Sequence, residues 1–474
     1  MAKVLQAAAI AANRFGYGAR PGDLAAIKDD PRGWLKSQLD RDVPEPAPLD
    51  DLPPGGADFI AFSVWLRAYR ARVQQGVEPK GPGTSLLARH LNAIRVRYAQ
   101  AVQTDSPFRE RLVHFWSNHF VVSGATGSAI AMPPSFEREV ARPHVCGRFG
   151  DMLSASSKHP AMLYYLDNYL SIGPNSRWGR RPSSAPKLPS VLGKLRGINE
   201  NLAREILELH TVSVNGGYTQ DDVIAFAKVL TGWGIDLGRW LNGDLREAAP
   251  RQARDLFYFN PRAHEPGPAT IMGETYDQPD EAQGEAVLKR LAVHPKTAQF
   301  IATKLARHFV ADTPPEPLIE RLARRFLDTE GDLRAVAVTL VDSDEAWSPD
   351  RQKYKRPEEF AVSTVRALGG PVMEGGHWQT LLESMGQPPY KQPGPDGWSD
   401  LSADWTGPDA LWKRIEWALM AAKRAVGAGV EPLAFAEAVL GPDVGANTKS
   451  AVRSAETPQE AVALVLSSPE FLRR

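Results

Sequence analysis

The segment NENLAREILELHTVSVNGGYTQDDVIAFAKVLTGW, residues 199–233, decides the fold class of this chain. Its apolar residues Leu202, Ile206 and Leu209 recur at helical spacing and predict an amphipathic helix over residues 199–211. Two glycines follow and supply the backbone freedom of a sharp turn. The TQDD sequence after them has the spacing of a capping box, which begins a second helix. We therefore predict two helices joined by a tight glycine turn.

The same periodicity predicts helices along most of the chain. Strands and helices do not alternate regularly, which argues against a doubly wound α/β fold. One short β-hairpin is predicted, in which residues 256–259 pair with residues 270–273. The predicted fold class is therefore mainly α, a large multi-helical body with one small β-hairpin. Further helices are expected at residues 58–73, 85–102, 107–120, 295–311, 331–341, 357–368, 410–426 and 458–472.

The length and composition are those of a globular protein. With 474 residues, of which 43% are hydrophobic and 24% charged, the chain can bury a large core. We predict a single helical domain over residues 1–474, with an alternative division into 1–172 and 198–474. That division would fall at segment 173–197, which is rich in Pro, Ser, Gly and basic residues.

Charge, cysteine content and hydropathy exclude several classes of protein. The 56 basic and 56 acidic residues cancel, so we expect no nucleic-acid partner. The single cysteine, Cys146, excludes an internal disulfide and a multi-cysteine zinc site. No run approaches the ~20 apolar residues of a membrane span. The N-terminal apolar run is short and broken by Gln6, so we expect a cytoplasmic protein without a cleaved signal, with export alongside a partner left open.

Segment 199–233 is similar to the signature of a bacterial family called domain of unknown function 1800. The resemblance implies a large protein without an established activity. It also implies a partner, because members are often encoded beside a second family that resembles phosphatases and sulfatases. Relatives often have a basic residue shortly after His264, where this chain has Ala269 and Thr270. Other matching pieces are NRFGYG from Asn13, HFWSNHF from His114, HPKTAQFIATKL from His294, KRPEEF from Lys355 and PDGW from Pro395.

Helical geometry disfavours a metal motif within one helix. Two chelating residues on a helix need a spacing of three or four. His114 and His119 are five apart, as are Glu205 and His210, which is about 140° around a regular helix. A metal would need ligands from several helices, such as His114, His210 and His264 with Glu205. This metalloprotein hypothesis stays open, and the metal and any cofactor remain unknown.

The first functional hypothesis is an enzyme that uses acid–base chemistry on a polar or anionic substrate. Its basis is the concentration of polar residues in the family-like segments. Glu200, Arg204 and Glu208 recur at i, i+4 and i+8, and form either an exposed charge ladder or a buried network. The predicted catalytic residues are His114, Asn118, Glu200, Arg204, Glu205, His210 and His264.

Two loops supply candidates for substrate binding. Arg180 and Arg181 lie in the basic segment 173–197, which either lacks fixed structure or forms an anion-collecting lid. Trp398 and Trp405 lie in a Pro- and Gly-rich stretch and could form a ligand wall. The alternative function is a non-catalytic scaffold or partner of a phosphatase- or sulfatase-like protein, because no recognised catalytic signature is present.

Overall fold

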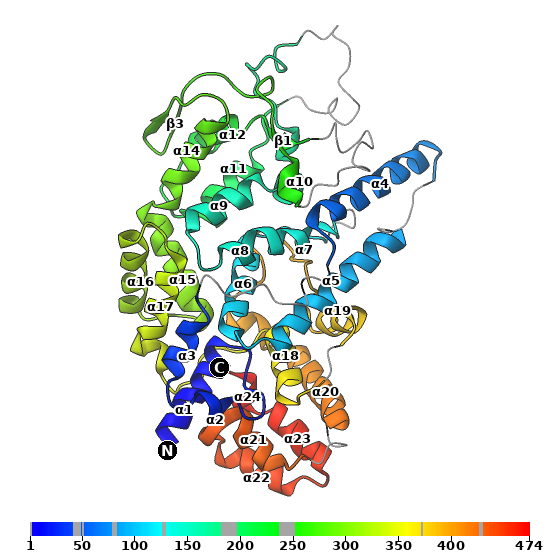
Figure 1. The fold of residues 1–474 in the computed structure, drawn as a ribbon, viewed down its shortest axis with the longest axis vertical. Helices are drawn as coiled ribbons and strands as arrows, with labels where there is room; N and C mark the ends of the chain where they lie inside the picture. Colours follow the sequence, from blue (N-terminus) through cyan, green and yellow to red (C-terminus); the bar gives the residue numbers. More distant parts are fainter. Residues whose placement is uncertain are drawn as a thin grey trace.

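Helix α6 (Pro107–His119) lies at the centre of the molecule (Figure 1). Eleven of its 13 residues are buried. A helix at the surface of a globular protein normally exposes one face to solvent, so burial on all sides marks α6 as a core helix. Its polar side chains must therefore find partners inside the protein.

The computed structural model describes residues 2–40, 49, 52–77, 83–125, 129–181, 197–236, 252–370, 373–425 and 430–474. Residues 2–27 lie toward the lower end of the molecule, residues 132–165 lie above α6, and α4 and α5 project together as an arm (Figure 1). The elements of this part are α1 (Ala2–Ile10), η1 (Ala11–Phe15), α2 (Asp23–Ile27), α3 (Pro31–Ser37), α4 (Gly55–Gln74), α5 (Gly83–Gln103), α7 (Met132–Phe136), η3 (Glu137–Ala141), α8 (Arg142–His144), α9 (Phe149–Lys158), α10 (Pro160–Tyr165) and η4 (Asn168–Leu170).

Residues 201–276 lie at the end of the molecule that is at the top of Figure 1, and the helices between residues 281 and 342 follow along one of its sides. The predicted capping box is present, since the Thr219 side chain accepts from the backbone N–H of Asp222 and the Asp222 carboxylate accepts in return. The elements are α11 (Asn201–Glu205), η5 (Ile206–His210), α12 (Gln220–Val229), β1 (Trp233–Ile235), η7 (Ala253–Leu256), β2 (Phe257–Phe259), β3 (Ala269–Ile271), β4 (Glu274–Tyr276), α14 (Glu281–Ala292), α15 (Pro295–Phe309), α16 (Glu316–Asp328), α17 (Leu333–Asp342) and η8 (Asp344–Trp347).

The predicted pairing of residues 256–259 with residues 270–273 is wrong. The described residues contain two antiparallel two-stranded sheets, in which β1 pairs with β2 and β3 pairs with β4. Met272 and Gly273 both have positive φ and form the tight turn between β3 and β4. Residues 270–273, which are predicted as one strand, therefore contain the turn between β3 and β4. The partner of β2 is β1, which follows α12 much earlier in the chain.

The C-terminal part packs beneath α6 and against the N-terminal helices (Figure 1). The predicted helix over residues 458–472 is two helices, because Ser468 caps a new helix that has Pro469 at its first position. The elements are α18 (Pro357–Ala367), α19 (Gly375–Ser384), η9 (Ser402–Trp405), α20 (Pro408–Ala425), α21 (Pro432–Leu440), η11 (Gly441–Asp443), α22 (Ala446–Ser454), α23 (Pro458–Leu466) and α24 (Pro469–Leu472).

The apolar core has two clusters. The first extends from α1 to residue Ala346 and the second joins α18–α24 with Tyr17 and parts of α5. The mainly α fold class is confirmed, and no helix among the described residues is long and apolar enough to cross a bilayer.

Segments from distant parts of the chain meet at α6. Arg14 donates to the carbonyl of Ala346 at 2.7 Å, and Arg111 of α6 donates to the carbonyls of Arg14 and Gly16. The NRFGYG sequence is therefore fixed between α6 and the chain that follows α17.

Candidate active site

Asn118, near the end of α6, holds the loop that contains the PDGW sequence. Its amide nitrogen donates to the carbonyl of Trp398, and its side-chain oxygen accepts from the backbone N–H of Trp398, both at 2.8 Å. Gly397 has φ +82°, and a Cβ atom there would lie 2.6 Å from the carbonyl oxygen of Asn118. Only glycine fits this close approach. Residues 396–398 are therefore fixed against the end of α6.

His119, the next residue, connects α6 to two further elements. Its Nε2 lies 3.1 Å from the carbonyl oxygen of His210, and its Nδ1 lies 3.1 Å from Nζ of Lys304. Because a carbonyl only accepts, Nε2 bears the hydrogen and Nδ1 accepts from Lys304. Burial, followed by the charge of Lys304, lowers the pKa of His119 well below its usual value. The neutral imidazole thus joins α6 to α15 and η5.

Glu205 is the last residue of α11 and precedes the π-helical turn η5. Hydrogen bonds of a π helix join residues five apart, so Glu205 and His210 lie on about the same face. The ~140° separation expected from a regular helix is therefore wrong for this pair. The extra residue of the π turn also buries Leu207 in place of Leu209.

Tyr165, Glu205, Glu208 and Asp396 form what we call the Glu205 cluster. Burial, followed by the charges of Glu208 and Asp396, raises the pKa of Glu205 to about 7. Burial and the charges of Glu205 and Asp396 raise the pKa of Tyr165 to about 12, so this phenol stays protonated at neutral pH. Asp396 is exposed and the other three side chains are half-buried. The cluster is therefore accessible to solvent and contains a carboxyl group that titrates near neutral pH.

A buried network of charged side chains fixes the loop from its other end. Glu359 accepts from Arg111 at 2.9 Å and from Arg474 at 3.0 and 3.1 Å. His308 contacts Arg111 through Nε2 at 3.1 Å and Asp400 through Nδ1 at 2.8 Å. Burial lowers the pKa of His308 to about 3, so the imidazole is neutral at pH 7. His308 is therefore a buried residue that links two charged groups.

His114 lines a small polar cavity, which we call the His114 cavity. Its Nδ1 lies 2.5 Å from the Tyr17 hydroxyl oxygen, and its Nε2 lies 3.5 Å from Oε1 of Glu110. Asn118 and Trp398 line the same cavity. Three of the residues predicted for the site are therefore neighbours, and the loop of residues 396–398 lies between this cavity and the Glu205 cluster.

The predicted charge row consists of Glu200, Arg204 and Glu208, which are all partly exposed. Glu200 and Arg204 form a partly exposed ion pair at 2.9 Å, and Gln220 bonds both side chains. Glu208 instead accepts from the Tyr218 hydroxyl at 3.3 Å. The predicted row is therefore reduced to one partly exposed ion pair between Glu200 and Arg204, and Glu208 does not take part in it.

His210 and His264 are both buried. Burial, followed by the charge of Lys304, lowers the pKa of His210 to about 3. His264 contacts the carbonyl of Thr231 through Nδ1 at 2.9 Å. The adjacent Glu265 accepts from the backbone N–H and the side-chain amide of Asn175 at 2.8 and 2.6 Å. Glu265 therefore anchors the chain at residues 173–181, and His264 holds the turn at Thr231.

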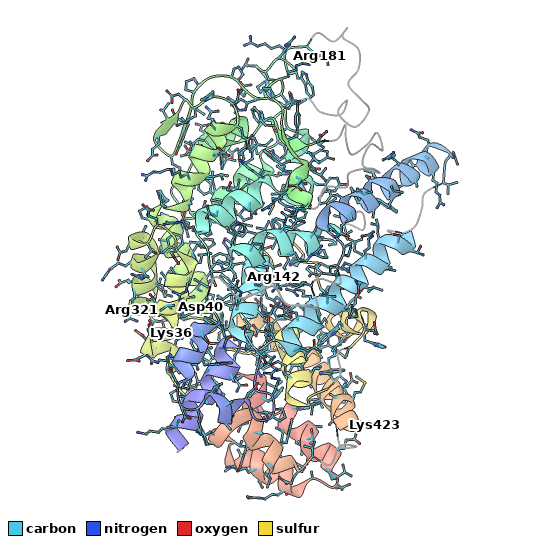
Figure 2. All side chains as sticks on the ribbon, in the orientation of Figure 1. Lys36, Asp40, Arg142, Arg181, Arg321 and Lys423 are labelled. Atoms are coloured by element: carbon cyan, nitrogen blue, oxygen red, sulfur yellow. The ribbon has the colours of Figure 1, made fainter. Side chains whose placement is uncertain are left out.

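Of the predicted substrate-binding residues, Trp398 and Trp405 are neighbours, and the arginines lie in a different segment at the surface. Arg180 and Arg181 are exposed, and residues 182–196 of the basic segment lie outside the described residues. Figure 2 shows Arg181 at one end of the molecule and Arg142, which pairs with Glu110 beside His114, near its centre. Trp405 is buried and donates to the carbonyl of Ser399 at 2.9 Å, with its ring 6.1 Å from that of Trp398.

The main site residues that the sequence-based prediction missed are Asp396, Lys304, His119 and Tyr165. Three of them lie in sequences that were already singled out, namely PDGW, HPKTAQFIATKL and HFWSNHF. The signal for these three is the ionisable residue that each sequence contains. Tyr165 has no such sequence signal. Among the described residues, no group of three or more His, Cys, Asp or Glu side chains has the geometry of a metal site.

Comparison with known proteins gives one match. A family model described as Protein of unknown function (DUF1800) matches residues 10–473. No curated protein and no solved structure matches the chain. The family match includes every segment that meets at the end of α6. The chain therefore belongs to the DUF1800 family of proteins of unknown function.

Proposed function

We propose that this protein is an enzyme that hydrolyses or transfers a group by acid–base catalysis at the Glu205 cluster. The observation that supports this proposal most directly is Glu205 itself. It is a half-buried carboxyl group whose pKa is raised to about 7 by burial and by two neighbouring carboxylates. A general acid or base works best when its pKa is near the working pH, and such groups concentrate in active sites.

The neighbours of Glu205 provide the other functions that such a reaction needs. Asp396 is an exposed carboxylate on a loop that Asn118 fixes, and it is suited to activate a nucleophile or to stabilise positive charge. The Tyr165 hydroxyl, which stays protonated, can donate a hydrogen bond to the substrate. Lys304, held by His119, supplies a cation close to Asp396. We assign the proton transfer to Glu205 and the accompanying carboxylate function to Asp396.

The charge of the cluster favours a polar, uncharged substrate. Three carboxyl groups would repel an anion at close range. Tyr165 belongs to the cluster and Trp398 follows Asp396 by two residues, and aromatic rings of this kind can pack against a neutral polar molecule. We therefore favour a neutral polar substrate over an anionic one.

Chromogenic substrates with the same leaving group test this proposal. Nitrophenyl esters, glycosides and phosphates would be assayed with the wild-type protein, Glu205→Gln and Asp396→Asn between pH 5 and 9. We expect one class to be cleaved, with a pH dependence near 7 that Glu205→Gln abolishes. A carbon-13 NMR titration that places the pKa of Glu205 at the ordinary value of about 4.3 would contradict the proposal.

A second candidate function, a non-catalytic partner of a phosphatase- or sulfatase-like protein, is supported by an apolar helix face. Trp412 and Met420 of α20 are 60% and 56% exposed, and Leu411 and Leu419 are exposed beside them. Exposed aromatic and methionine side chains are typical of protein-binding surfaces. Co-purification with the phosphatase-like protein, compared between wild type and Trp412→Ser, tests it.

A cytoplasmic location stays a prediction from the N-terminal sequence.

A further inference from the structure

The His114 cavity is polar, but its charged groups already have partners. Arg97 pairs with Glu137 at 2.9 Å and with Glu358 at 3.1 Å. Glu358 also accepts from Arg356 at 3.1 Å, and the Tyr390 hydroxyl donates to Glu137 at 3.3 Å. The residues around the cavity are Arg97, Tyr98, His114, Ser117, Asn118, Glu358, Gln387, Pro389, Tyr390, Gln392 and Trp398.

Three side chains that line the cavity each have one buried polar atom without a hydrogen-bond partner among the described residues. These atoms are Nε2 of His114, Nε2 of Gln387 and Oε1 of Gln392. The three residues are only 2%, 2% and 7% exposed. An unpaired buried polar atom costs about 1–3 kcal/mol, and buried waters satisfy such atoms in native proteins. Three at one small cavity indicate that a guest molecule satisfies them.

The free atoms define the chemistry of that guest. One amide nitrogen can only donate and one amide oxygen can only accept, so the guest must both accept and donate hydrogen bonds. A hydroxyl oxygen has both abilities. The guest is neutral, because the surrounding ions are already paired. The free space is about 10 Å³, close to the roughly 10–15 Å³ that one water molecule requires.

We propose that the His114 cavity is a binding site for one neutral hydroxyl group, occupied by an ordered water that bridges His114, Gln387 and Gln392. The contact between Nε2 of His114 and Oε1 of Glu110 is 3.5 Å long, which is longer than an ordinary hydrogen bond, so Nε2 can donate to this guest instead. The water connects α6 to residues 387–392, just before the loop that Asn118 holds. It therefore stabilises the loop from the side opposite to the Glu205 cluster, and it does not depend on the proposed function.

The substitution Gln392→Met tests the site, because a bound water and a dry cavity predict different changes in stability. In Gln392→Met the bound water loses a partner, so the urea midpoint of unfolding falls below that of wild type. If the cavity were dry, the same change would remove an unpaired oxygen and the midpoint would rise or stay constant. Gln379 is the matched control, because its Oε1 is also unpaired but it does not line the cavity. Gln379→Met should leave the midpoint constant or raise it.

A crystal structure of the full wild-type chain gives an independent result that does not require a stable variant. We expect one isolated oxygen atom at about 2.7–3.2 Å from the three unpaired atoms. Density that continues from this oxygen into a carbon chain would identify the hydroxyl of a bound alcohol or polyol instead of water. The proposal is overturned if the three groups bond one another, or if Gln392→Met is as stable as wild type or more stable.

Discussion

Replacement of Glu205 by glutamine should stabilise the protein at alkaline pH. Glu205 has its pKa raised from 4.5 to about 7, so folding opposes its ionisation. A raised pKa contributes stability below 4.5, and this contribution is lost as the pH rises through 7. The difference corresponds to at most about 3.4 kcal/mol. Because Glu205 is only half-buried, solvent screening reduces the expected effect to about 1–2 kcal/mol.

Urea unfolding of wild type and Glu205→Gln at pH 4 and pH 8 measures this effect. The variant should be more stable than wild type at pH 8 and equal to it at pH 4. Glu330→Gln is a suitable control, because it makes the same chemical change at a side chain that is 76% exposed. If Glu205→Gln is no more stable than wild type at pH 8, folding does not oppose ionisation of Glu205 and the proposed role loses its basis.

Three further predictions follow from named contacts. Asp396→Asn removes a charge that raises the pKa of Glu205, so NMR titration should give a lower pKa that still exceeds 4.5, because burial remains. Glu359→Gln leaves the buried arginines around Glu359 without their carboxylate and should cost about 3–5 kcal/mol in urea unfolding. Burial raises the pKa of Glu359, but the charges of Arg474, Arg111 and Arg356 outweigh burial and hold this pKa well below its usual value. The contribution of Glu359 to the stability of the fold is therefore present above about pH 4.3 and is lost as the pH falls. This loss of stability at acid pH should be missing in the variant. Glu265→Ala removes both bonds to Asn175, so trypsin should cleave after Arg180 faster than in wild type; an unchanged rate would refute the anchoring role.

Much of the fold could be predicted because helical periodicity and capping are local properties. The capping box at Thr219 and the helix that follows it needed only a few neighbouring residues. The β pairing was wrong because β1 and β2 are separated by more than twenty residues, and short strands of three residues give almost no periodic signal. The π turn after Glu205 was also missed, because the sequence has the apolar spacing of a regular helix there.

The candidate site was only partly predictable for a related reason. Glu205 and Asn118 were identified from their segments, but their partner segments meet only in three dimensions. Lys304 lies in α15, and Asp396 lies in a loop almost one hundred residues later. No local pattern indicates that the two approach the same helix end. The raised pKa of Glu205 depends on this approach, so it could not be derived from the order of residues alone.

The contact between Arg14 and the carbonyl of Ala346 also has a consequence for synthesis of the chain. These residues are separated by 332 positions, so the partner of Arg14 is made long after Arg14 leaves the ribosome. At about 5–20 residues per second this delay is roughly 17–66 s. During that time the buried faces of η1 and α6 lack their native cover. Residues 11–15 are therefore made long before the segment that covers them, and chaperones have this interval in which to bind there.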